Sequence, residues 1–170
     1  KLFLSGRKYI DVALIQLSLP DQYGFCSFGI NVDIGKPIAQ SAYLTIAEIN
    51  PHMPRTLGNS FIHLKEIDYF VYHEHPLLEF HFDEPTKVVK KIGKNLSNLV
   101  QDKSTIHIGF GDLPHNILKY LSQKKDLGMH SHYITDAIIP LIENGVLTCR
   151  KKNFHPEKII TSFALGSRKL

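Results

Sequence analysis

Two stretches of the chain are almost continuously apolar, and each has the length of a β-strand. Residues 10–17 read IDVALIQL and residues 43–49 read YLTIAEI, with β-branched residues in both runs. Such uninterrupted apolar runs are typical of parallel strands that are covered on both faces. The pattern therefore predicts two buried strands in the first third of the chain.

The spacing of the apolar residues changes after Pro85. Between Val88 and Val100 apolar side chains recur every three or four residues, whereas the neighbouring lysines fall largely on the other side. This spacing predicts an amphipathic helix with a solvated lysine face.

Strands and helices then alternate to the end of the chain. The pattern predicts strands at residues 105–109, 129–133 and 159–164, and helices at residues 114–122 and 136–144. We expect Asp136 to cap the last helix at its N-terminus and Gly145 to end it. The alternation predicts an α/β fold with mostly parallel sheets and flanking helices.

A change of pattern marks a boundary between two domains. Residues 73–76 (HEHP) and 83–85 (DEP) are rich in histidine, proline and acidic residues, and regular alternation restarts beyond them. We therefore predict one domain at residues 1–83 and a second at residues 84–170.

The composition is that of a globular protein. Of 170 residues, 43% are hydrophobic and 21% are charged, which excludes disordered and disulfide-rich secreted classes. The formal net charge of +4 is small and scattered, so it does not predict binding to nucleic acid. No apolar run approaches the ~18 residues that span a bilayer, and the start does not read as a signal peptide. Cys26 and Cys149 are isolated, so we expect buried, reduced thiols and a cytoplasmic protein.

The two ends of the sequence suggest a piece of a longer protein. The chain begins with Lys1 rather than methionine, and it ends at Leu170 directly after a predicted buried strand. We expect further chain on both sides.

Six segments, in this order and spacing, carry a family resemblance. They are residues 12–33 (VALIQLSLPDQYGFCSFGINVD), 46–68 (IAEINPHMPRTLGNSFIHLKEID), 75–80 (HPLLEF), 108–118 (IGFGDLPHNIL), 127–136 (LGMHSHYITD) and 158–170 (KIITSFALGSRKL). The chain resembles the acetyl-CoA hydrolase/transferase family, which includes 4-hydroxybutyrate CoA-transferases.

The resemblance implies a two-domain class I CoA-transferase architecture with the active site between the domains. Residues 1–83 would be the end of the first domain and residues 84–170 the start of the second. Leu2, Phe3 and Gly6 look like the LF-x-x-G segment that the family carries late in its first domain.

The resemblance also implies covalent catalysis by a glutamate. The glutamate attacks an acyl-CoA to form an anhydride, CoA thiolate then forms a glutamyl-CoA thioester, and an acceptor carboxylate resolves it. The corresponding glutamate is expected beyond Leu170, so we expect no catalytic residue in this chain. CoA is then a substrate, no cofactor is bound permanently, and the partners are an acyl-CoA and a small carboxylic acid, without nucleic acid or membrane. Homo-oligomerisation is left open.

A glycine-rich turn at residues 109–114 is the first candidate for substrate or CoA binding. Gly109, Phe110 and Gly111 follow a predicted strand, and Pro114 falls in the first turn of the next helix. Glycines allow the backbone to approach a ligand, and helix N-termini present free N–H groups. A tight turn without a ligand is the alternative, but the segment matches the family's G-x-G-x-[IL]-P motif.

Arg55 in the segment MPRT is the second candidate, because a guanidinium binds a carboxylate or phosphate in a bidentate manner. The alternative is that Arg55 ties a loop to the sheet. His63 lies in an apolar segment, and we expect it to be a satisfied core histidine rather than a catalytic one.

His130 and Ser131 are the third candidate, at the end of a predicted strand, where α/β proteins bind ligands. The family commonly has glutamate where this chain has His132 and glycine where it has Ala137. These departures leave the substrate specificity open.

The cluster of His73, Glu74 and His75, with His81 nearby in the sequence, suggests a metal site, because two imidazoles and a carboxylate can hold an ion. No fixed partner is evident in the sequence, so we expect a solvated interdomain segment and no metal.

Three functions follow from these patterns. The first is a fragment of a CoA-transferase acting on acids of the 4-hydroxybutyrate, butyrate or acetate type. The second is a non-catalytic α/β module for association or ligand sensing. The third is an acyl-CoA hydrolase in which water replaces the acceptor acid.

Overall fold

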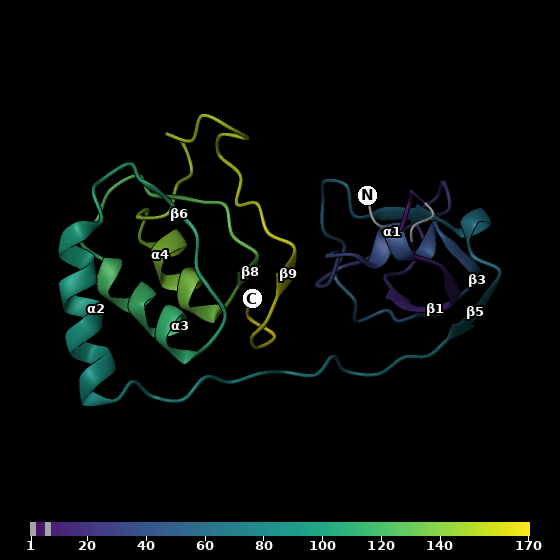
Figure 1. The fold of residues 1–170 in the computed structure, drawn as a ribbon, viewed down its shortest axis with the longest axis horizontal. Helices are drawn as coiled ribbons and strands as arrows, with labels where there is room; N and C mark the ends of the chain where they lie inside the picture. Colours follow the sequence, from purple (N-terminus) through teal and green to yellow (C-terminus); the bar gives the residue numbers. More distant parts are fainter. Residues whose placement is uncertain (1–2, 6–7) are drawn as a thin grey trace. The chain divides into compact units, whose positions relative to one another are not determined.

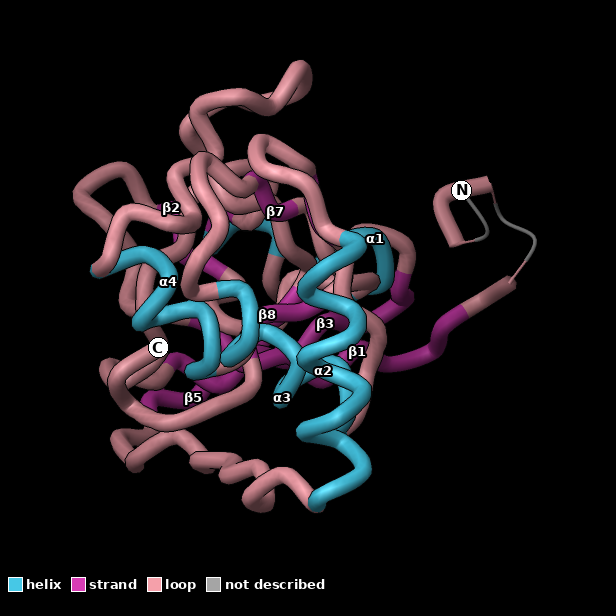
Figure 2. The backbone as a smooth tube through the Cα atoms, turned by 90° about the vertical axis from the view of Figure 1, so that its left-hand side faces the viewer, coloured by secondary structure: helices cyan, strands magenta, loops and turns pink. Residues whose placement is uncertain are grey.

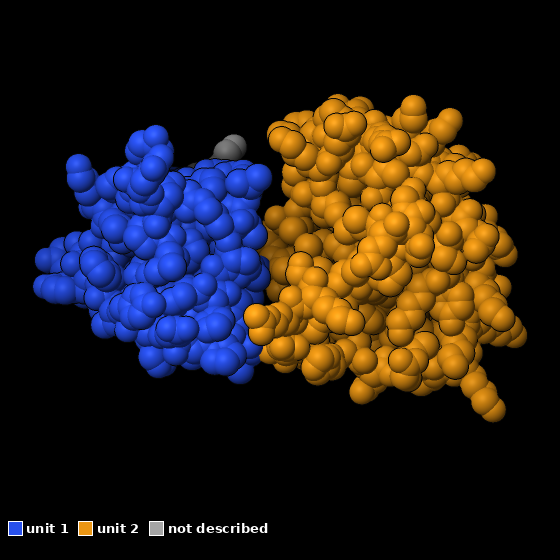
Figure 3. All heavy atoms as spheres, turned by 180° about the vertical axis from the view of Figure 1, so that it is seen from behind, with its two compact units in different colours: residues 1–78 blue, residues 79–170 orange. Residues whose placement is uncertain are grey.

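The computed structural model describes residues 3–5 and 8–170 and divides into two compact units, residues 1–78 and 79–170 (Figure 3). The division lies five residues before the predicted boundary at 83/84. Assignment of the units to two CoA-transferase domains stays a prediction. Two members of the expected LF-x-x-G segment, Leu2 and Gly6, lie outside the described residues.

The N-terminal unit is built on a parallel sheet of order β1–β3–β5 (Figure 1). Its strands are β1 (Ile10–Leu17), β3 (Ala42–Ile49) and β5 (Tyr69–Tyr72). A second, antiparallel pair consists of β2 (Phe25–Ser27) and β4 (Phe61–His63). Helix α1 (Gly35–Ala39) precedes β3, and the short helix η1 (Leu64–Glu66) follows β4. The first predicted strand is confirmed at both ends, and the second to within one residue.

Only one face of this sheet is well covered. Along β1 and β3 the buried residues alternate, with Ala13, Leu17 and Ala47 facing the core. On the other face Leu14 is 77% exposed and Val12 is 47% exposed. The expectation that both strands are covered on both faces is therefore wrong for the described residues, because the small helix α1 and the β2–β4 pair pack on one side only.

The C-terminal unit contains two short parallel pairs. Strands β6 (Thr105–Ile106) and β7 (Gly128–Met129) pair with each other, as do β8 (Tyr133–Ile134) and β9 (Phe163–Ala164). Single bridges join Leu127 to Leu147 and His130 to Ile160. The three longer strands that the pattern predicts are present as these shorter pieces, and the mixed α/β fold with mostly parallel pairing is confirmed.

Helices supply most of the remaining structure of this unit. They are α2 (Lys87–Leu99), α3 (Asp112–Leu118) with η2 (Lys119–Leu121), and η3 (Asp136–Ile138) with α4 (Ile139–Glu143). Figures 1 and 2 show α2 beside α3. Helix α2 can pack closely here because residue 93 is a glycine. A side chain at this position would clash with the ring of Tyr120 in η2. The core behind the helices includes Leu118, Leu121 and Met129.

One of the two expected helix ends differs from the prediction. Thr135 precedes η3, and the carboxylate of Asp136 instead accepts hydrogen bonds from the backbone N and Oγ of Ser167, at 2.8 and 3.1 Å. The prediction that Asp136 caps the helix is wrong, because residues brought close by the fold compete for its oxygens. Gly145 ends α4 with a φ of +67° and donates its N–H to Ile142 O, as predicted.

None of the described helices is long and apolar enough to cross a bilayer. Cys26 and Cys149 are buried free thiols, as expected.

Candidate functional site

The glycine-rich turn of the C-terminal unit is open to solvent. Gly111 has a φ of +122°, a value that favours glycine, and a Cβ at this position would meet nothing within 4 Å. Phe110 is 69% exposed beside it. Helix α3 begins at the next residue, Asp112, and Pro114 lies in its first turn as predicted. The turn can therefore take a ligand against its backbone, although the carboxylate of Asp112 disfavours a strongly anionic group there.

Ser131 fixes the start of this turn through hydrogen bonds of its hydroxyl group. Its hydroxyl donates to Ile108 O and accepts from Ile108 N, both at 3.1 Å, and Ser131 is only 4% exposed. Ile108 directly precedes Gly109, so the hydroxyl fixes the point at which the chain enters the turn. Because both bonds go to backbone, Ser131 acts on the turn and is not placed to contact a substrate.

Tyr133 is a residue of this region that the sequence analysis missed. Its ring centroid lies 5.3 Å from that of Phe110, and it is fully buried. Burial raises the pKa of its hydroxyl, and the backbone of Gly111 opposes that shift. Within the described residues the hydroxyl lacks a hydrogen-bond partner at normal geometry. The hydroxyl is buried and lies against the backbone of Gly111, so Tyr133 supports the turn from within the core.

His130 lies on the exposed side of the β7–β8 connection. Its ring stacks on that of Phe154 with centroids 6.0 Å apart, and its backbone N donates to Ile106 O at 3.1 Å. His132, at a position where the family commonly has glutamate, packs edge-on against Phe163. The exposed rings are accessible to a ligand, but among the described residues no carboxylate or hydroxyl bonds to either ring.

A cavity of about 420 Å³ lies on the helical side of this unit. It is lined by Phe82, His115, Lys119 and Asp136, among others. The His115 ring stacks on Phe82 at 3.9 Å, and its Nδ1 lies 2.9 Å from Thr135 Oγ1. Burial lowers the pKa of His115. The sequence analysis missed this histidine, although its position three residues before Leu118 places both on the buried side of α3.

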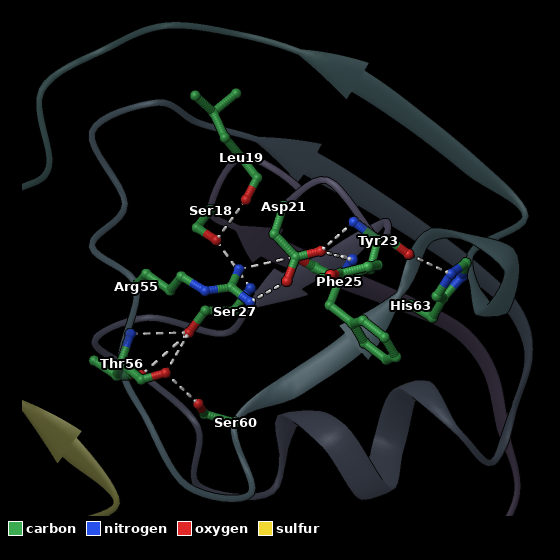
Figure 4. Close-up of polar contacts among 10 residues, drawn as sticks. All are labelled: Ser18, Leu19, Asp21, Tyr23, Phe25, Ser27, Arg55, Thr56, Ser60 and His63. Atoms are coloured by element: carbon green, nitrogen blue, oxygen red, sulfur yellow. Dashed lines mark hydrogen bonds and ion pairs between the residues drawn. The ribbon is translucent and has the colours of Figure 1, made fainter.

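Arg55 in the N-terminal unit is engaged by its own chain (Figure 4). Its guanidinium forms a 2.6 Å ion pair with Asp21 and donates to Phe25 O at 2.9 Å, and it lies 4.5 Å from the centre of the Phe61 ring. Asp21 also accepts from the backbone N–H groups of Tyr23 and Phe25. The Phe25 hydrogen bond is the main cause of its lowered pKa, and Arg55 contributes. Through these contacts Arg55 holds its loop against the neighbouring segment at residues 21–25. This is the structural alternative considered for Arg55 in the sequence analysis.

The neighbouring segment is bonded into the same unit. Buried Ser27 accepts hydrogen bonds from Thr56 N and Gly29 N, and Ser60 donates to Thr56 O at 2.7 Å (Figure 4). His63 accepts a hydrogen bond from Lys65 N at the start of η1. It is satisfied, as expected, but as a half-exposed turn residue rather than in the core.

The predicted site residues are divided between the two units. Those of the C-terminal unit lie on or under one turn and the adjoining strand ends; they are Gly109, Phe110, Gly111, Pro114, His130 and Ser131. Arg55 belongs to the N-terminal unit, where its partners are structural.

Comparisons with known proteins point to one kind of enzyme. The chain is 48% identical over 169 residues to the 4-hydroxybutyrate coenzyme A transferase of Clostridium kluyveri, covering 99% of this chain and 39% of that protein. It is 33% identical to a succinyl-CoA:acetate/propanoyl-CoA:succinate CoA transferase of Fasciola hepatica, covering 99% of this chain and 36% of that protein.

Solved structures agree. The crystal structure of 4-hydroxybutyrate CoA-transferase from Porphyromonas gingivalis superposes with a TM-score of 0.92 at 35% identity, over 99% of this chain and 43% of that one. RipA from Yersinia pestis superposes with a TM-score of 0.88 at 30% identity, over 94% of this chain and 37% of that one. The chain thus spans less than half the length of each of these relatives. Residues 2–80 match the acetyl-CoA hydrolase/transferase N-terminal domain, and with these likenesses the match assigns the chain to the acetyl-CoA hydrolase/transferase family.

Proposed function

We propose that the full-length protein transfers CoA between an acyl-CoA and a small carboxylic acid of the 4-hydroxybutyrate, butyrate or acetate type. The observation that carries this proposal is the 48% identity to a 4-hydroxybutyrate CoA transferase, which extends over 169 residues. The Fasciola hepatica relative is named for succinyl-CoA, acetate, propanoyl-CoA and succinate, so the acid is specified only as a small carboxylate.

The proposed chemistry passes through a glutamyl-CoA thioester on a glutamate outside residues 1–170. Attack of the carboxylate on the thioester carbonyl and each later step pass through a tetrahedral oxyanion, which needs fixed hydrogen-bond donors. CoA is a substrate in this scheme and no permanently bound cofactor is needed. The purified 170-residue chain is then expected to release no CoA from acyl-CoA.

Within this chain we assign the turn at Gly109–Gly111 to the acyl-CoA. Its support is the open space at Gly111 and the exposed ring of Phe110 beside it. Because Asp112 places a negative charge in the first turn of α3, the turn suits the thioester end of the substrate better than the phosphates of CoA. Ser131 positions the turn through Ile108, and His130 is assigned to its rim.

Arg55 remains a proposed ligand for a carboxylate or phosphate only if the substrate displaces Asp21. The 2.6 Å ion pair and the hydrogen bond to Phe25 O must both be given up or shared for that to happen. We therefore rank it below the turn.

The transfer reaction is tested with the full-length protein by following acyl-CoA species chromatographically. Acetyl-CoA with 4-hydroxybutyrate or butyrate should give the new acyl-CoA and free acetate. A hydrolase, which the name of the matched family also allows, would release free CoA at the same rate without an acceptor acid. Turnover that ignores the acceptor would overturn the transferase proposal.

A glycine substitution tests the turn. Gly111→Ala should lower kcat/KM for acyl-CoA by about 10-fold or more, because a methyl group blocks close approach of the substrate to the backbone. Gly145→Ala is the matched control, since Gly145 also has a positive φ and open space around its Cβ position. Equal kinetics in the two variants would remove the turn from the substrate site.

We also infer a cytoplasmic location, supported by the two buried, unpaired thiols. Self-association stays a proposal, which light scattering on the full-length protein tests.

A further inference from the structure

Three side chains able to bind a metal gather at the carboxyl ends of β3 and β5. Glu48 lies near the end of β3, and His73 and His75 follow directly after β5. One ligand atom from each of the three lies within 4.8 Å of the others. We call these three residues the Glu48 cluster. It lies in the N-terminal unit, apart from the glycine-rich turn, which belongs to the C-terminal unit.

The parallel register explains why these residues meet. Glu48 is the partner of Val71 across the β3–β5 pair, and side chains two residues apart on a strand share a face. His73 keeps this register beyond the end of β5, because its backbone N donates to Ile49 O at 3.1 Å. The carbonyl of His75 accepts a hydrogen bond from Asn50 Nδ2 at 2.9 Å, which fixes the second histidine. The ends of parallel strands are where α/β sheets bind ligands.

The hydrogen bond on the far side of His75 sets its protonation pattern. Nδ1 lies 3.0 Å from the carbonyl oxygen of Pro76, which can only accept, so Nδ1 carries a hydrogen. In the neutral ring Nε2 then carries no hydrogen and has a free lone pair. This nitrogen lies 2.7 Å from Glu48 Oε1. Two lone pairs at this distance repel each other unless a proton, an amide N–H or a cation lies between or beside them. A ligating histidine that donates its other N–H to a backbone carbonyl is the usual arrangement in metal sites.

The carboxylate has the outer partner that metal ligands usually have. Gln16, opposite Glu48 in the β1–β3 register, donates a hydrogen bond from Nε2 to Glu48 Oε1. Its amide nitrogen also lies 3.2 Å from His75 Nε2. A bound ion would take the lone pair of His75 and leave the glutamine to orient Glu48.

One of the two separations from Glu48 suits a first-row transition metal, whereas His75 Nε2, at 2.7 Å from Glu48 Oε1, has to move outward to make room for an ion. With bonds of about 2.0–2.2 Å, ligand atoms in a tetrahedral site lie roughly 3.4 Å apart. Glu48 Oε2 and His73 Nδ1 are 3.4 Å apart. The side chain of His73 is 62% exposed, so it can rotate to close the widest separation in the cluster.

We propose that Glu48, His73 and His75 bind one divalent transition-metal ion of the zinc class. Two imidazoles and one carboxylate suit Zn²⁺, Co²⁺ or Ni²⁺ and not Mg²⁺ or Ca²⁺, which take oxygen ligands. Three protein ligands with partial exposure leave a coordination position for water or a small anion. This proposal departs from the expectation of no metal at these residues, and it does not depend on the proposed CoA transfer.

The competing explanation is an ion pair between Glu48 and a doubly protonated His75. In that arrangement Nε2–H donates to Glu48 and Nδ1–H to Pro76 O, and no ion is needed. The two explanations differ in whether added metal binds stoichiometrically.

Calorimetric titration of the EDTA-treated 170-residue chain with Zn²⁺ tests the proposal. We expect one equivalent to bind, and Co²⁺ added in its place should give the visible absorption of a tetrahedral or five-coordinate site. His75→Gln and Glu48→Gln should each weaken Zn²⁺ binding by at least about 10-fold. Mg²⁺ at millimolar concentration should not compete.

His81→Gln is the matched control, because His81 is an exposed histidine near a single glutamate in the C-terminal unit. It should bind Zn²⁺ as the unaltered chain does, and far-ultraviolet circular dichroism should show that all three variants are folded. Failure of the unaltered chain to bind stoichiometric Zn²⁺, or equal binding by the folded His75→Gln variant, would overturn the proposal in favour of the ion pair.

Discussion

Replacing Ser131 by alanine removes the hydroxyl that holds the entry to the glycine-rich turn. The hydroxyl is the hydrogen-bond partner of both Ile108 N and Ile108 O at 3.1 Å, and no other described residue bonds to either group. Ile108 is 7% exposed and belongs to the core of its unit. Ser131→Ala therefore leaves a buried donor and a buried acceptor without partners, and the volume hardly changes.

The size of the effect follows from those two groups. A buried polar group left unsatisfied costs about 1–3 kcal/mol. Water can reach part of this backbone because the turn beside it is open at Phe110, which is 69% exposed. We therefore expect the free energy of unfolding to fall by about 2–4 kcal/mol, a large share of the 5–15 kcal/mol typical of a domain.

Urea unfolding followed by circular dichroism measures this loss. With an m-value of about 2 kcal/mol per molar urea, the midpoint should move down by about 1–2 M. The amide of Ile108 should also lose protection from hydrogen exchange. Ser122→Ala is the control, because Ser122 is exposed and its side chain makes no hydrogen bond among the described residues. Free energies of unfolding within about 0.5 kcal/mol of each other in the two variants would refute this account of the turn.

Three further outcomes test other parts of the molecule. Asp136→Ala should lower stability by about 1.5–3 kcal/mol in urea unfolding, because two charged hydrogen bonds to Ser167 are lost. Its helical dichroism should stay unchanged, whereas a marked loss would restore the capping role. Because burial lowers the pKa of His115, the unfolded chain takes up the proton more readily, so stability should be full above about pH 6.5 and decline below it. His115→Gln should flatten that decline, and an unchanged pH profile would contradict it. Burial raises the pKa of Cys26 to about 11, so the folded chain should resist a thiol reagent at pH 8 and react twice once unfolded, at Cys26 and Cys149.

The sequence predicted best those elements whose pattern is local and long. The strand at residues 10–17 and the helix at residues 87–99 contain enough apolar positions to define one period each. The strands of the C-terminal unit were predicted too long, because their apolar runs continue through residues that form single bridges rather than ladders. His130, which bridges to Ile160 between β7 and β8, is an example.

The solvent exposure of the strand side chains was predicted least well. An apolar run signals a strand covered on both faces only when two layers of chain pack against it, and the run itself carries no information about the second layer. Leu14 is apolar and exposed for this reason. The same limit applies to Asp136, where a local capping preference lost to Ser167, a residue 31 positions away.

For Arg55 the sequence identified an anion-binding side chain but not the group that it binds. The motif identifies a guanidinium suited to an anion, and the fold supplies one from its own chain, Asp21, 34 residues earlier. A carboxylate held at 2.6 Å satisfies the arginine before any substrate arrives, so a ligand must compete with an interaction that also orders the loop.

In the Glu48 cluster the fold brings to the two histidines a carboxylate that the sequence pattern did not identify. Two histidines two residues apart point the same way on an extended strand, but a pair of imidazoles alone makes a weak site. The carboxylate comes from the neighbouring parallel strand, and its position is set by the register that pairs Gln16 with Glu48 and Glu48 with Val71. A shift of that register by one residue would turn Glu48 to the other face of the sheet. Metal binding by this chain would therefore require the correct pairing of three strands. Strand β3 supplies Glu48, the end of β5 supplies the two histidines, and β1 supplies Gln16, the hydrogen-bond partner of Glu48.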